Sequence, residues 1–416
     1  MTNHAPSTNE QKDTGPGTRS VHAGEQRPYP HHALSPPIAQ TATYTFEDSK
    51  DLTDFMDRRM WGMAEGRVEY GRYGNPTVTA AENKLAALDR GEEAILFSSG
   101  MNAITTTLLS LLKSGDHIVI TDDAYRRTRQ FCQDTLSRFG IECTPVPAGD
   151  LGALEAALQP QTRLIMSESP TNPYLRVMDL ESLSEIAADH GAKTLIDATF
   201  ATPINQRPLE HGIDLVLHSA TKYIGGHNDV LAGSVTGAGP LIAMIRQTLW
   251  VMGGVIDPHA AFLVHRGLKS LALRVRQQNR TAQAIAESLQ AEPEVERVWY
   301  PGLASHPDHS IATAQMEGFG GVVSFELNTD LRGTSQFIDA VNIPVIASSL
   351  GGLETLIEQP ALMSYYELSS EERADLGIKE NLVRLAVGIE DPEDLITDLR
   401  SALRVISPQP APAESH

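Results

Sequence analysis

Between residues 76 and 237 the chain alternates between two kinds of segment. Short apolar runs of strand length are separated by longer stretches whose apolar residues recur at helical spacing. The runs are AILFSS (94–99), HIVITD (117–122), RLIMSES (163–169), TLIDA (194–198), LVLHSA (215–220) and GSVTG (233–237). The helical stretches include 77–89, 102–113, 126–139 and 180–190. This alternation predicts a mainly parallel sheet with helices on both faces.

The chain of 416 residues is long enough for two domains. A helical stretch at 257–290 is followed by the strand-like runs GGVVSFEL (320–327) and LVRLAVGIE (382–390), which predict a smaller C-terminal α/β unit. The segments on either side are rich in proline and polar residues. We therefore predict the following organisation: a disordered arm at 1–18, an extended arm at 19–75, a large domain at 76–256, a C-terminal domain at 257–406 and a tail at 407–416.

The overall composition excludes several classes of function. With 33 basic and 53 acidic side chains the formal charge is −20, which argues against nucleic acids and anionic membranes as partners. The sequence contains no run of 18 apolar residues, so we expect no transmembrane helix. The polar N-terminus lacks the apolar core of a signal peptide. We therefore expect a cytoplasmic protein. The two cysteines, Cys132 and Cys143, are too few for a disulfide framework or a zinc site. We expect them to be packing residues, and we expect no metal.

In a parallel sheet ligands bind at the carboxyl ends of the strands, and Lys222 lies just after one of the apolar runs. A lysine there must be exposed, paired or covalently used, because burial of its charge is costly. A neutral amine can form a Schiff base with an aldehyde. Its neighbours Ser219 and Thr221 offer hydroxyl donors suited to a phosphate. The alternative is a strand-end lysine that points to water.

Asp197 ends the run TLIDA in the same predicted sheet. A buried aspartate needs a cationic partner, and the pyridinium nitrogen of pyridoxal 5′-phosphate (PLP) is one. A carboxylate at this nitrogen keeps it protonated and makes the ring an electron sink. A helix N-cap or turn aspartate is the alternative interpretation.

Four further residues fit the same cofactor. Ser99, Gly100 and Met101 join a strand to a helix, where backbone N–H groups bind phosphate. Tyr125 follows HIVITD, so its ring could stack on a cofactor and its hydroxyl could move protons. Each pattern also occurs in ordinary turns and in ordinary packing.

Two arginines are candidates for binding anions. Arg72 lies beside Tyr70 in VEYGRYGNPT (68–77), and its guanidinium suits a phosphate. Arg384 lies inside the apolar run NLVRLAVGIE (381–390), where a substrate carboxylate would balance its charge. An arginine at an exposed strand edge is the alternative.

Taken in order along the chain, these segments resemble the trans-sulfuration (Cys/Met metabolism) family of PLP enzymes. Within that family they are most similar to the plant-type cystathionine γ-synthases. The resemblance covers 19–406. It rests on the motifs YGRYGNPT, SSGM, ESPTNP (168–173), IDATFATP (196–203), HSATKYIGGHND (218–229), SSLGGLETLIEQPALMS (348–364) and NLVRLAVGIED (381–391). It implies an α/β fold like that of aspartate aminotransferase, with a large, mainly parallel sheet domain and a smaller C-terminal α/β domain. It also implies a homotetramer, built as a dimer of dimers with shared active sites.

The resemblance assigns a role to each candidate. Lys222 would bind PLP as a Schiff base and move protons, Asp197 would pair with the ring nitrogen, and Tyr125 would stack on the ring. Gly100, Met101, Ser219 and Thr221 would hold the phosphate of the cofactor. Tyr70 and Arg72 would reach the phosphate of the cofactor bound in the neighbouring subunit. The remaining roles concern the substrate: Asn172 would position cofactor and substrate, and Arg384 with Ser349 would bind the substrate carboxylate.

The reaction implied is γ-replacement, in which an O-activated homoserine and cysteine give cystathionine. The alternative is a γ-lyase acting on cystathionine, methionine or canavanine. Three departures from family patterns bear on this choice. Ala198 stands where asparagine is common, and Ser348 where several synthases and γ-lyases carry glutamate. Arg127 stands near the place where methionine γ-lyases carry cysteine, which argues against efficient methionine cleavage.

Two other classes of protein fit less well. A PLP-binding regulatory protein without catalysis predicts loss of Lys222 or Arg384, and both are present. A nicotinamide dehydrogenase needs a glycine fingerprint after the first strand, and the sequence has none.

Overall fold

The structure is a computed structural model that describes residues 14–61 and 66–407. Of the segments predicted to be disordered, 1–13 and 408–416 lie outside the described residues, whereas helix α1 (Pro16–His22) begins inside the predicted N-terminal arm. The chain forms two compact units. Unit 1 contains the residues up to Glu168 and Asp179–Ala272, and unit 2 contains Ser169–Met178 and the residues from Leu273 onward. This division falls inside the long helix α10 (Pro258–Gln290), and the domain boundary at 256/257 stays a prediction.

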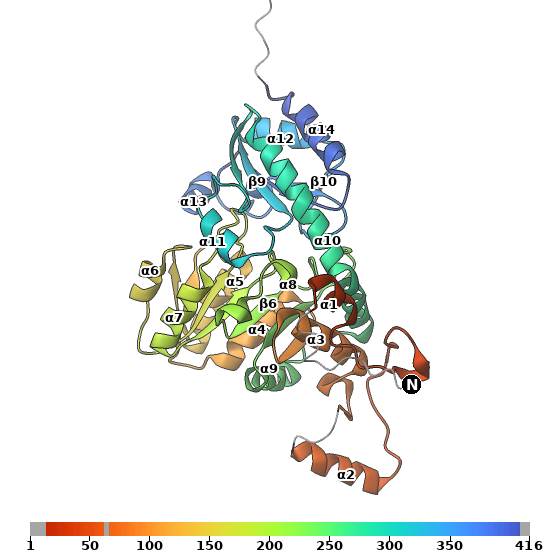
Figure 1. Cartoon of the computed structure of the whole chain (residues 1–416). Helices are drawn as coiled ribbons and strands as arrows, with labels where there is room; N and C mark the ends of the chain where they lie inside the picture. The colour runs from red at the N-terminus through yellow and green to blue at the C-terminus, as the bar shows by residue number, and fades with distance from the viewer. Residues whose placement is uncertain (1–13, 62–65, 408–416) are drawn as a thin grey trace, which may run out of the picture. The chain divides into compact units, whose positions relative to one another are not determined.

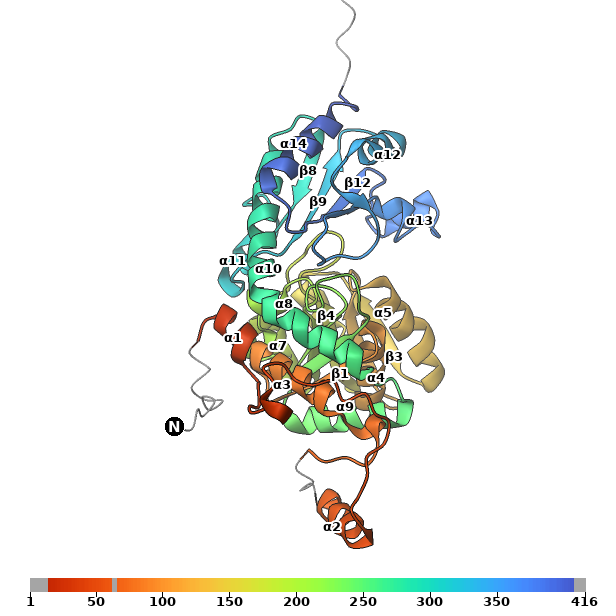
Figure 2. The same cartoon turned by 90° about the vertical axis from the view of Figure 1, so that its right-hand side faces the viewer.

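Unit 1 is built on a seven-stranded sheet with the order β1-β7-β6-β5-β4-β2-β3. Its strands are β1 (Glu93–Phe97), β2 (His117–Thr121), β3 (Glu142–Val146), β4 (Thr162–Glu168), β5 (Lys193–Asp197), β6 (Leu215–His218) and β7 (Gly233–Gly237). The pairs from β3 through β2, β4 and β5 to β6 are parallel, and β7 runs antiparallel to both of its neighbours. Helices lie on both faces of the sheet (Figures 1 and 2). The predicted mainly parallel α/β architecture is confirmed.

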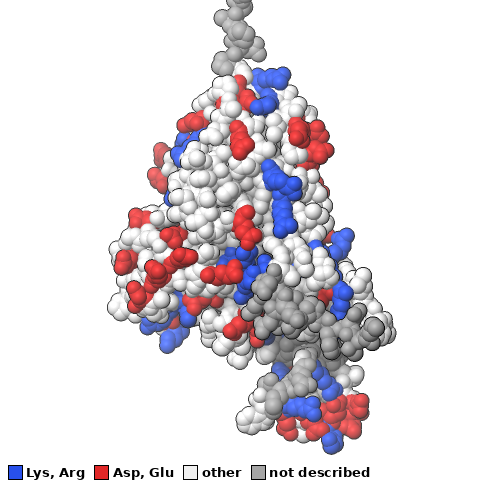
Figure 3. Space-filling view, viewed as in Figure 1, with Lys and Arg blue, Asp and Glu red and all other residues white. Residues whose placement is uncertain are grey.

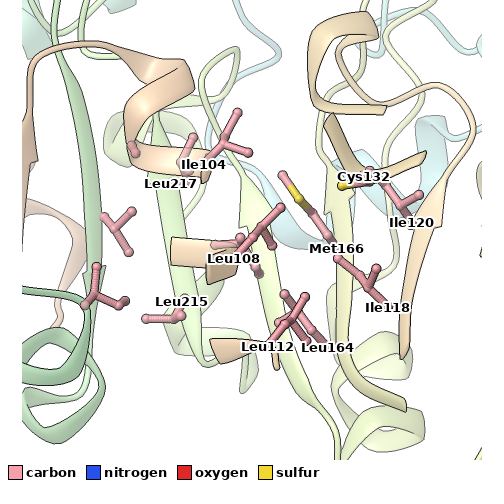
Figure 4. Close-up of a cluster of buried hydrophobic side chains, with 14 of the residues drawn as sticks. Ile104, Leu108, Leu112, Ile118, Ile120, Cys132, Leu164, Met166, Leu215 and Leu217 are labelled. Carbon is pink, nitrogen blue, oxygen red and sulfur yellow. The ribbon is translucent and has the colours of Figure 1, made fainter. Parts of the chain in front are cut away.

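One face of this sheet packs against α4 (Gly100–Leu111) and α9 (Gly239–Met252), which contact each other. Side chains alternate between the faces of a strand, so every second strand residue enters this core. From the strands come Ile95, Phe97, Ile118, Ile120, Leu164, Met166, Leu195, Leu215, Leu217 and Val235, and Figure 4 shows several of them against Ile104, Leu108 and Leu112. Cys132 lies in the same core with Cys143 packed against it, and neither forms a disulfide.

The opposite face is covered by α3 (Pro76–Asp89), which contacts β1 and β7, and by α7 (Leu180–His190), which contacts β5. The other elements of unit 1 are η1 (Pro30–His32), α2 (Ser49–Met60), η2 (Gly71–Tyr73), α6 (Leu151–Ala156), α8 (Thr202–Asn205) and η5 (Pro208–His211). In both views α2 lies apart from the helices that cover the sheet (Figures 1 and 2). The segment 19–75, predicted to be extended, therefore contains helical turns as well.

Two features of unit 1 differ from the sequence prediction. Strand β3 was not predicted, because it is a half-exposed edge strand with Pro145 inside it and gives no continuous apolar run. The stretch 126–139 is not one α-helix: it consists of α5 (Arg126–Gln130), a π-helical turn η3 (Phe131–Thr135) and a 3₁₀ turn η4 (Leu136–Phe139). Apolar spacing over so few residues does not separate these helix types.

Unit 2 contains a five-stranded sheet with the order β10-β11-β12-β9-β8. Its strands are β8 (Val295–Trp299), β9 (Val322–Leu327), β10 (Val345–Ile346), β11 (Leu356–Glu358) and β12 (Leu382–Ala386). Its helices, besides the end of α10, are α11 (His309–Gln315), α12 (Leu331–Ala340), η6 (Pro360–Leu362), α13 (Ser370–Asp375) and α14 (Pro392–Leu403). Only β10 and β11 pair in parallel. The smaller second sheet of the predicted α/β fold is confirmed.

The charge excess of the sequence is visible on the surface, where acidic side chains gather over α6 and α7 (Figure 3). Exposed Glu155 belongs to α6, and exposed Glu181 and Glu185 belong to α7. None of the helices within 14–61 and 66–407 is long and apolar enough to cross a membrane.

Candidate active site

The carboxyl ends of β4, β5 and β6 bring three ionisable residues to one edge of the sheet. Glu168, Asp197 and His218 are the last residues of these neighbouring parallel strands. Glu168 is the register partner of Asp197, and Leu217, one residue before His218, is the partner on the other side. This is the edge at which open α/β sheets bind ligands.

Asp197 is buried, with 7% of its surface exposed. Its Oδ1 accepts hydrogen bonds from the Thr199 backbone N–H at 3.0 Å and from the Thr199 hydroxyl at 2.5 Å. Burial raises the pKa of Asp197, although these hydrogen bonds oppose the shift. Within the described part of the chain its Oδ2 accepts no hydrogen bond. A buried carboxylate with a free oxygen suits a cationic N–H such as a protonated pyridine nitrogen.

Glu168 was given no role from the sequence, yet it lies beside Asp197. Its Oε2 accepts a hydrogen bond from the Tyr125 backbone N–H at 2.8 Å. Burial, together with the charges of Asp197 and Asp123, raises the pKa of Glu168 well above its usual value. Its position at a strand end was the signal that could have revealed it. Glu168 fixes the backbone of Tyr125, the N-cap residue of α5, whose side chain is exposed. The stacking of Tyr125 on a cofactor ring stays a prediction.

The first turn of α4 has the features of a phosphate site. The Ser99 hydroxyl accepts from the Asn102 N–H at 3.1 Å, while the first N–H groups of a helix have no partner within it. A Cβ on Gly100 would lie 3.0 Å from the Cβ and Oγ of Ser219, so these two predicted phosphate ligands are adjacent. A Cβ on Gly233 would overlap the Ser99 carbonyl. Met101 packs against the core beside this turn.

Lys222 lies in the turn that follows β6 and is half-buried. Its backbone N–H donates to the Ser219 carbonyl at 3.0 Å, and the Gly226 N–H donates to the Lys222 carbonyl at 2.8 Å. The hydroxyl of Thr221 is engaged with Ala232, donating to its carbonyl at 3.1 Å and accepting from its N–H at 3.0 Å. Thr221 thus closes the loop 221–232, and its contact with a phosphate stays a prediction.

A chain of contacts joins these residues in unit 1. The Ser219 N–H donates to the Thr199 hydroxyl at 2.8 Å, and this hydroxyl donates to Asp197. Ser219 in turn lies against Gly100 and accepts from the Lys222 backbone. The phosphate cradle, the carboxylate and the lysine therefore form one cluster, and their chemistry fits PLP.

Tyr70 and Arg72 lie elsewhere in unit 1. Arg72 Nη1 donates to the Trp250 carbonyl at 2.5 Å, and its guanidinium lies over the rings of Tyr73 and Tyr70 at 4.9 and 5.7 Å. Within the described part of one chain, no hydrogen bond joins either residue to the Asp197 cluster. Their predicted contact is with a neighbouring subunit, which a single chain does not test.

Unit 2 brings the three predicted substrate-binding residues together around Arg384, which is buried in β12. Arg384 Nη1 donates to Asn172 Oδ1 at 3.1 Å, and Nη2 donates to the Ser349 carbonyl at 3.0 Å. Ser349 has a left-handed backbone conformation (φ 86°), so it contributes its carbonyl at a position strained for serine.

Glu358 completes this group and was missed from the sequence. Its Oε1 forms a buried ion pair with Arg384 Nη2 at 3.0 Å across the β11–β12 register. Arg384 Nε is buried and has no hydrogen-bond partner within 14–61 and 66–407. A fixed guanidinium with an unused N–H suits a carboxylate ligand. The described ranges contain no group of three or more side chains that could hold a metal ion.

Comparisons with known proteins agree with this chemistry. Residues 17–404 match the family described as Cys/Met metabolism PLP-dependent enzyme. The chain is 49% identical over 390 residues to cystathionine γ-synthase 1, chloroplastic, of Nicotiana tabacum, covering 93% of this chain and 71% of that one. It is 42% identical over 392 residues to L-methionine γ-lyase of Pseudomonas putida, covering 94% and 97%. The crystal structure of metB from Corynebacterium glutamicum superimposes with a TM-score of 0.88 at 36% identity, covering 95% and 99%.

Proposed function

Because the chain belongs to the Cys/Met metabolism family of PLP-dependent enzymes, we propose that it catalyses γ-replacement on an O-activated homoserine. Cysteine is the incoming nucleophile and cystathionine is the product. The observation that carries this proposal is the 49% identity to a plant cystathionine γ-synthase over 93% of the chain. The identity to the methionine γ-lyase of Pseudomonas putida is lower, at 42%.

Each residue of the unit 1 cluster has a task in this reaction. When bound, PLP supplies an electron sink that stabilises negative charge at the substrate Cα. Lys222 would hold the cofactor through its amine, and this amine, when free, would take the proton from the substrate Cα. Asp197 holds the ring nitrogen in its protonated form through the free Oδ2. The N–H groups at the start of α4 and the Ser219 hydroxyl bind the phosphate.

Arg384 has the task of binding the carboxylate of the amino acid substrate. Its planar guanidinium is oriented by Glu358, Asn172 and the Ser349 carbonyl. A guanidinium held in place loses less conformational entropy on binding than a free one does. Asn172 thereby helps to position the substrate.

A γ-lyase is the second candidate, since methionine γ-lyase and cystathionine β-lyase are also among the relatives. The test is a survey of products from activated homoserines, cystathionine, methionine and canavanine, with and without cysteine. The synthase predicts that added cysteine diverts the product of an activated homoserine from 2-oxobutyrate to cystathionine. An unchanged product ratio, with much faster cleavage of another amino acid, would instead establish the lyase.

We also propose that the active form is a homotetramer, a dimer of dimers in the cytoplasm. Helix α2 supports an interface, because Leu52, Met56 and Met60 recur every fourth residue and are exposed, as is Trp61 at its end. Such an apolar stripe on a helix that lies apart from the rest of unit 1 suits contact with another copy. Sedimentation of the wild type and of a Met56→Asp, Met60→Asp variant tests this, since the variant should form smaller assemblies.

A further inference from the structure

Behind the Asp197 cluster, unit 1 contains a buried ion pair that the proposed mechanism does not use. His218 Nε2 donates to Asp89 Oδ1 at 2.9 Å, and the Thr236 hydroxyl donates to Asp89 Oδ2 at 2.7 Å. The side chains of His218 and Asp89 are 1% and 0% exposed. Asp89 is the last residue of α3, so the pair lies on the α3 face of the sheet.

The strand that carries His218 pairs with the strand that carries the carboxylate proposed to hold the cofactor. His218 ends β6, and Asp197 ends the adjacent strand β5, with Asp197 in register with the preceding residue Leu217. The next residue, Ser219, donates to Thr199, whose hydroxyl donates to Asp197. The backbone that carries His218 is therefore connected to Asp197 through two hydrogen bonds.

The charges around this edge of the sheet favour an imidazolium at His218. Burial disfavours the charged ring, but the charge and hydrogen bond of Asp89, with the charge of Asp197, raise the pKa of His218. For Asp197, burial raises the pKa, while Thr199 and the charge of His218 oppose this shift. Glu168, on β4, adds a carboxyl on the other side of Asp197. The charges of Arg129 and Asp123 act on Glu168. Among Asp89, Glu168, Asp197 and His218, the positive charge comes from His218.

We infer that His218, held by Asp89, is a positioning residue that keeps Asp197 ionised for the protonated ring nitrogen of PLP. The inference rests on the proposed role of Asp197. A purely structural role is the competing explanation. A buried ion pair is weak evidence for stability, because desolvation of the two charges offsets their attraction. A positive charge beside a buried carboxylate, by contrast, acts on that carboxylate strongly, since the surroundings screen it little.

The test compares His218→Asn with His117→Asn. His117 is a matched control, because it is also a fully buried strand histidine of the same sheet. It begins β2, and its ring is hydrogen-bonded to neutral side chains, those of Thr162, Thr144 and Gln159. Three quantities are measured on each holoenzyme: the Kd of PLP, the pH midpoint of the visible absorption of bound PLP, and Tm.

We expect His218→Asn to weaken PLP binding on the order of tenfold, because loss of the positive charge at His218 makes the ionised form of Asp197 less favourable. The absorption midpoint should move to higher pH, because a ring nitrogen that is less protonated withdraws fewer electrons from the imine. His117→Asn should lower Tm and leave the other two quantities at their wild-type values. A His218→Asn enzyme with wild-type Kd and midpoint would overturn the inference, whatever its Tm.

Two further variants separate the possible failures. Asp89→Asn keeps a hydrogen-bonding group beside His218 and removes the charge, so it should shift Kd and midpoint in the same directions even if His218→Asn does not fold. Asp197→Asn tests the proposed function itself. If Asp197→Asn changes both quantities and Asp89→Asn changes neither, this inference fails and the cofactor role of Asp197 stands. If Asp197→Asn changes neither, the proposed role of Asp197 fails as well.

Discussion

At the scale of single residues, the site depends on buried ionisable groups whose partners fix their charge and direction. Glu168 and Asp197 are adjacent buried carboxyls with raised pKa values, and each is held by hydrogen bonds from a neighbouring backbone. Arg384 is held by an ion pair with the Glu358 side chain. Removal of one member of such a pair leaves the other buried without compensation.

Glu358→Gln tests whether the guanidinium of Arg384 depends on its ion pair with Glu358. The variant should raise KM for the amino acid substrate about tenfold with a smaller change in kcat, because Arg384 loses the group that orients it in both ground and transition state. It should also lower the free energy of unfolding by about 3 kcal/mol, since the guanidinium stays buried. The exposed Glu354→Gln, four residues earlier, is the control. A wild-type KM in Glu358→Gln would show that Arg384 does not depend on this ion pair.

Sequence patterns could predict the residues that end strands, because parallel strands bring their carboxyl ends to one edge. Asp197 was found in this way, and Glu168 could have been. Glu358 and Asp89 could not, since their partners lie in other elements and are fixed by the β11–β12 register and by the end of α3. Likewise, Thr221 has a phosphate-type hydroxyl in the sequence but bonds to Ala232 in the structure.

At the scale of elements, glycines let the strand β7 and the turn before α4 approach closely. Gly233→Ala should weaken PLP binding by more than tenfold, because its Cβ would overlap the Ser99 carbonyl and displace the start of α4. The control is Gly191→Ala at the end of α7, where φ is 76° but nothing lies within 4 Å of a new Cβ. The control should lose about 1 kcal/mol of stability and keep its PLP affinity. Equal PLP affinities in the two variants would contradict this account of the cradle.

Helix α1 is attached to α3 by a buried lysine. Lys84 Nζ donates to the carbonyls of Ser20, Val21 and Ala23 at 3.2, 3.0 and 3.0 Å, and Glu25 lies 3.5 Å from it. Burial lowers the pKa of Lys84 to about 8 from its usual value of 10.5. Between these two values the unfolded chain keeps a proton that the folded chain has released, so this group makes stability rise with pH.

We therefore expect the difference in unfolding free energy between wild type and Lys84→Met to increase from pH 8 to pH 10. The slope should not exceed about 1.4 kcal/mol per pH unit. Urea unfolding at a series of pH values measures it. A difference that stays constant over this range would mean that Lys84 titrates normally in the folded protein.

Apolar runs could predict the strands of the unit 1 sheet apart from the half-exposed edge strand β3, and β9 and β12 of the unit 2 sheet. Strand β8 is partly exposed, and β10 and β11 are only two and three residues long, so these three could not be predicted from apolar runs. The turns within 126–139 could not, because the hydrogen-bond pattern of a short helical stretch depends on its packing.

At the scale of the whole molecule, the sequence predicts shared active sites that a single chain does not display. Tyr70 and Arg72 contact Tyr73 and Trp250 of their own chain, and within the described residues no hydrogen bond joins them to the Asp197 cluster. The roles of Tyr70 and Arg72 in a neighbouring site leave no pattern in the sequence, so the family resemblance was needed to predict them.

Mixing Arg72→Ala with Lys222→Ala tests the sharing of sites. Each variant alone should be inactive, whereas after subunit exchange an equal mixture should recover roughly a quarter of wild-type activity, since half of the dimers carry one intact site. Native mass spectrometry verifies the exchange. Proven hybrids without activity would place Arg72 outside the neighbouring site.

The central claim is that Lys222 carries PLP at the carboxyl edge of the unit 1 sheet. Borohydride reduction of the PLP-loaded enzyme fixes the cofactor to the amine that holds it, and peptide mass spectrometry then identifies that residue. We predict phosphopyridoxyl label on the peptide that contains Lys222, and loss of this label together with the visible absorption band in Lys222→Ala. Label on a different lysine, or an unchanged band in Lys222→Ala, would contradict the account.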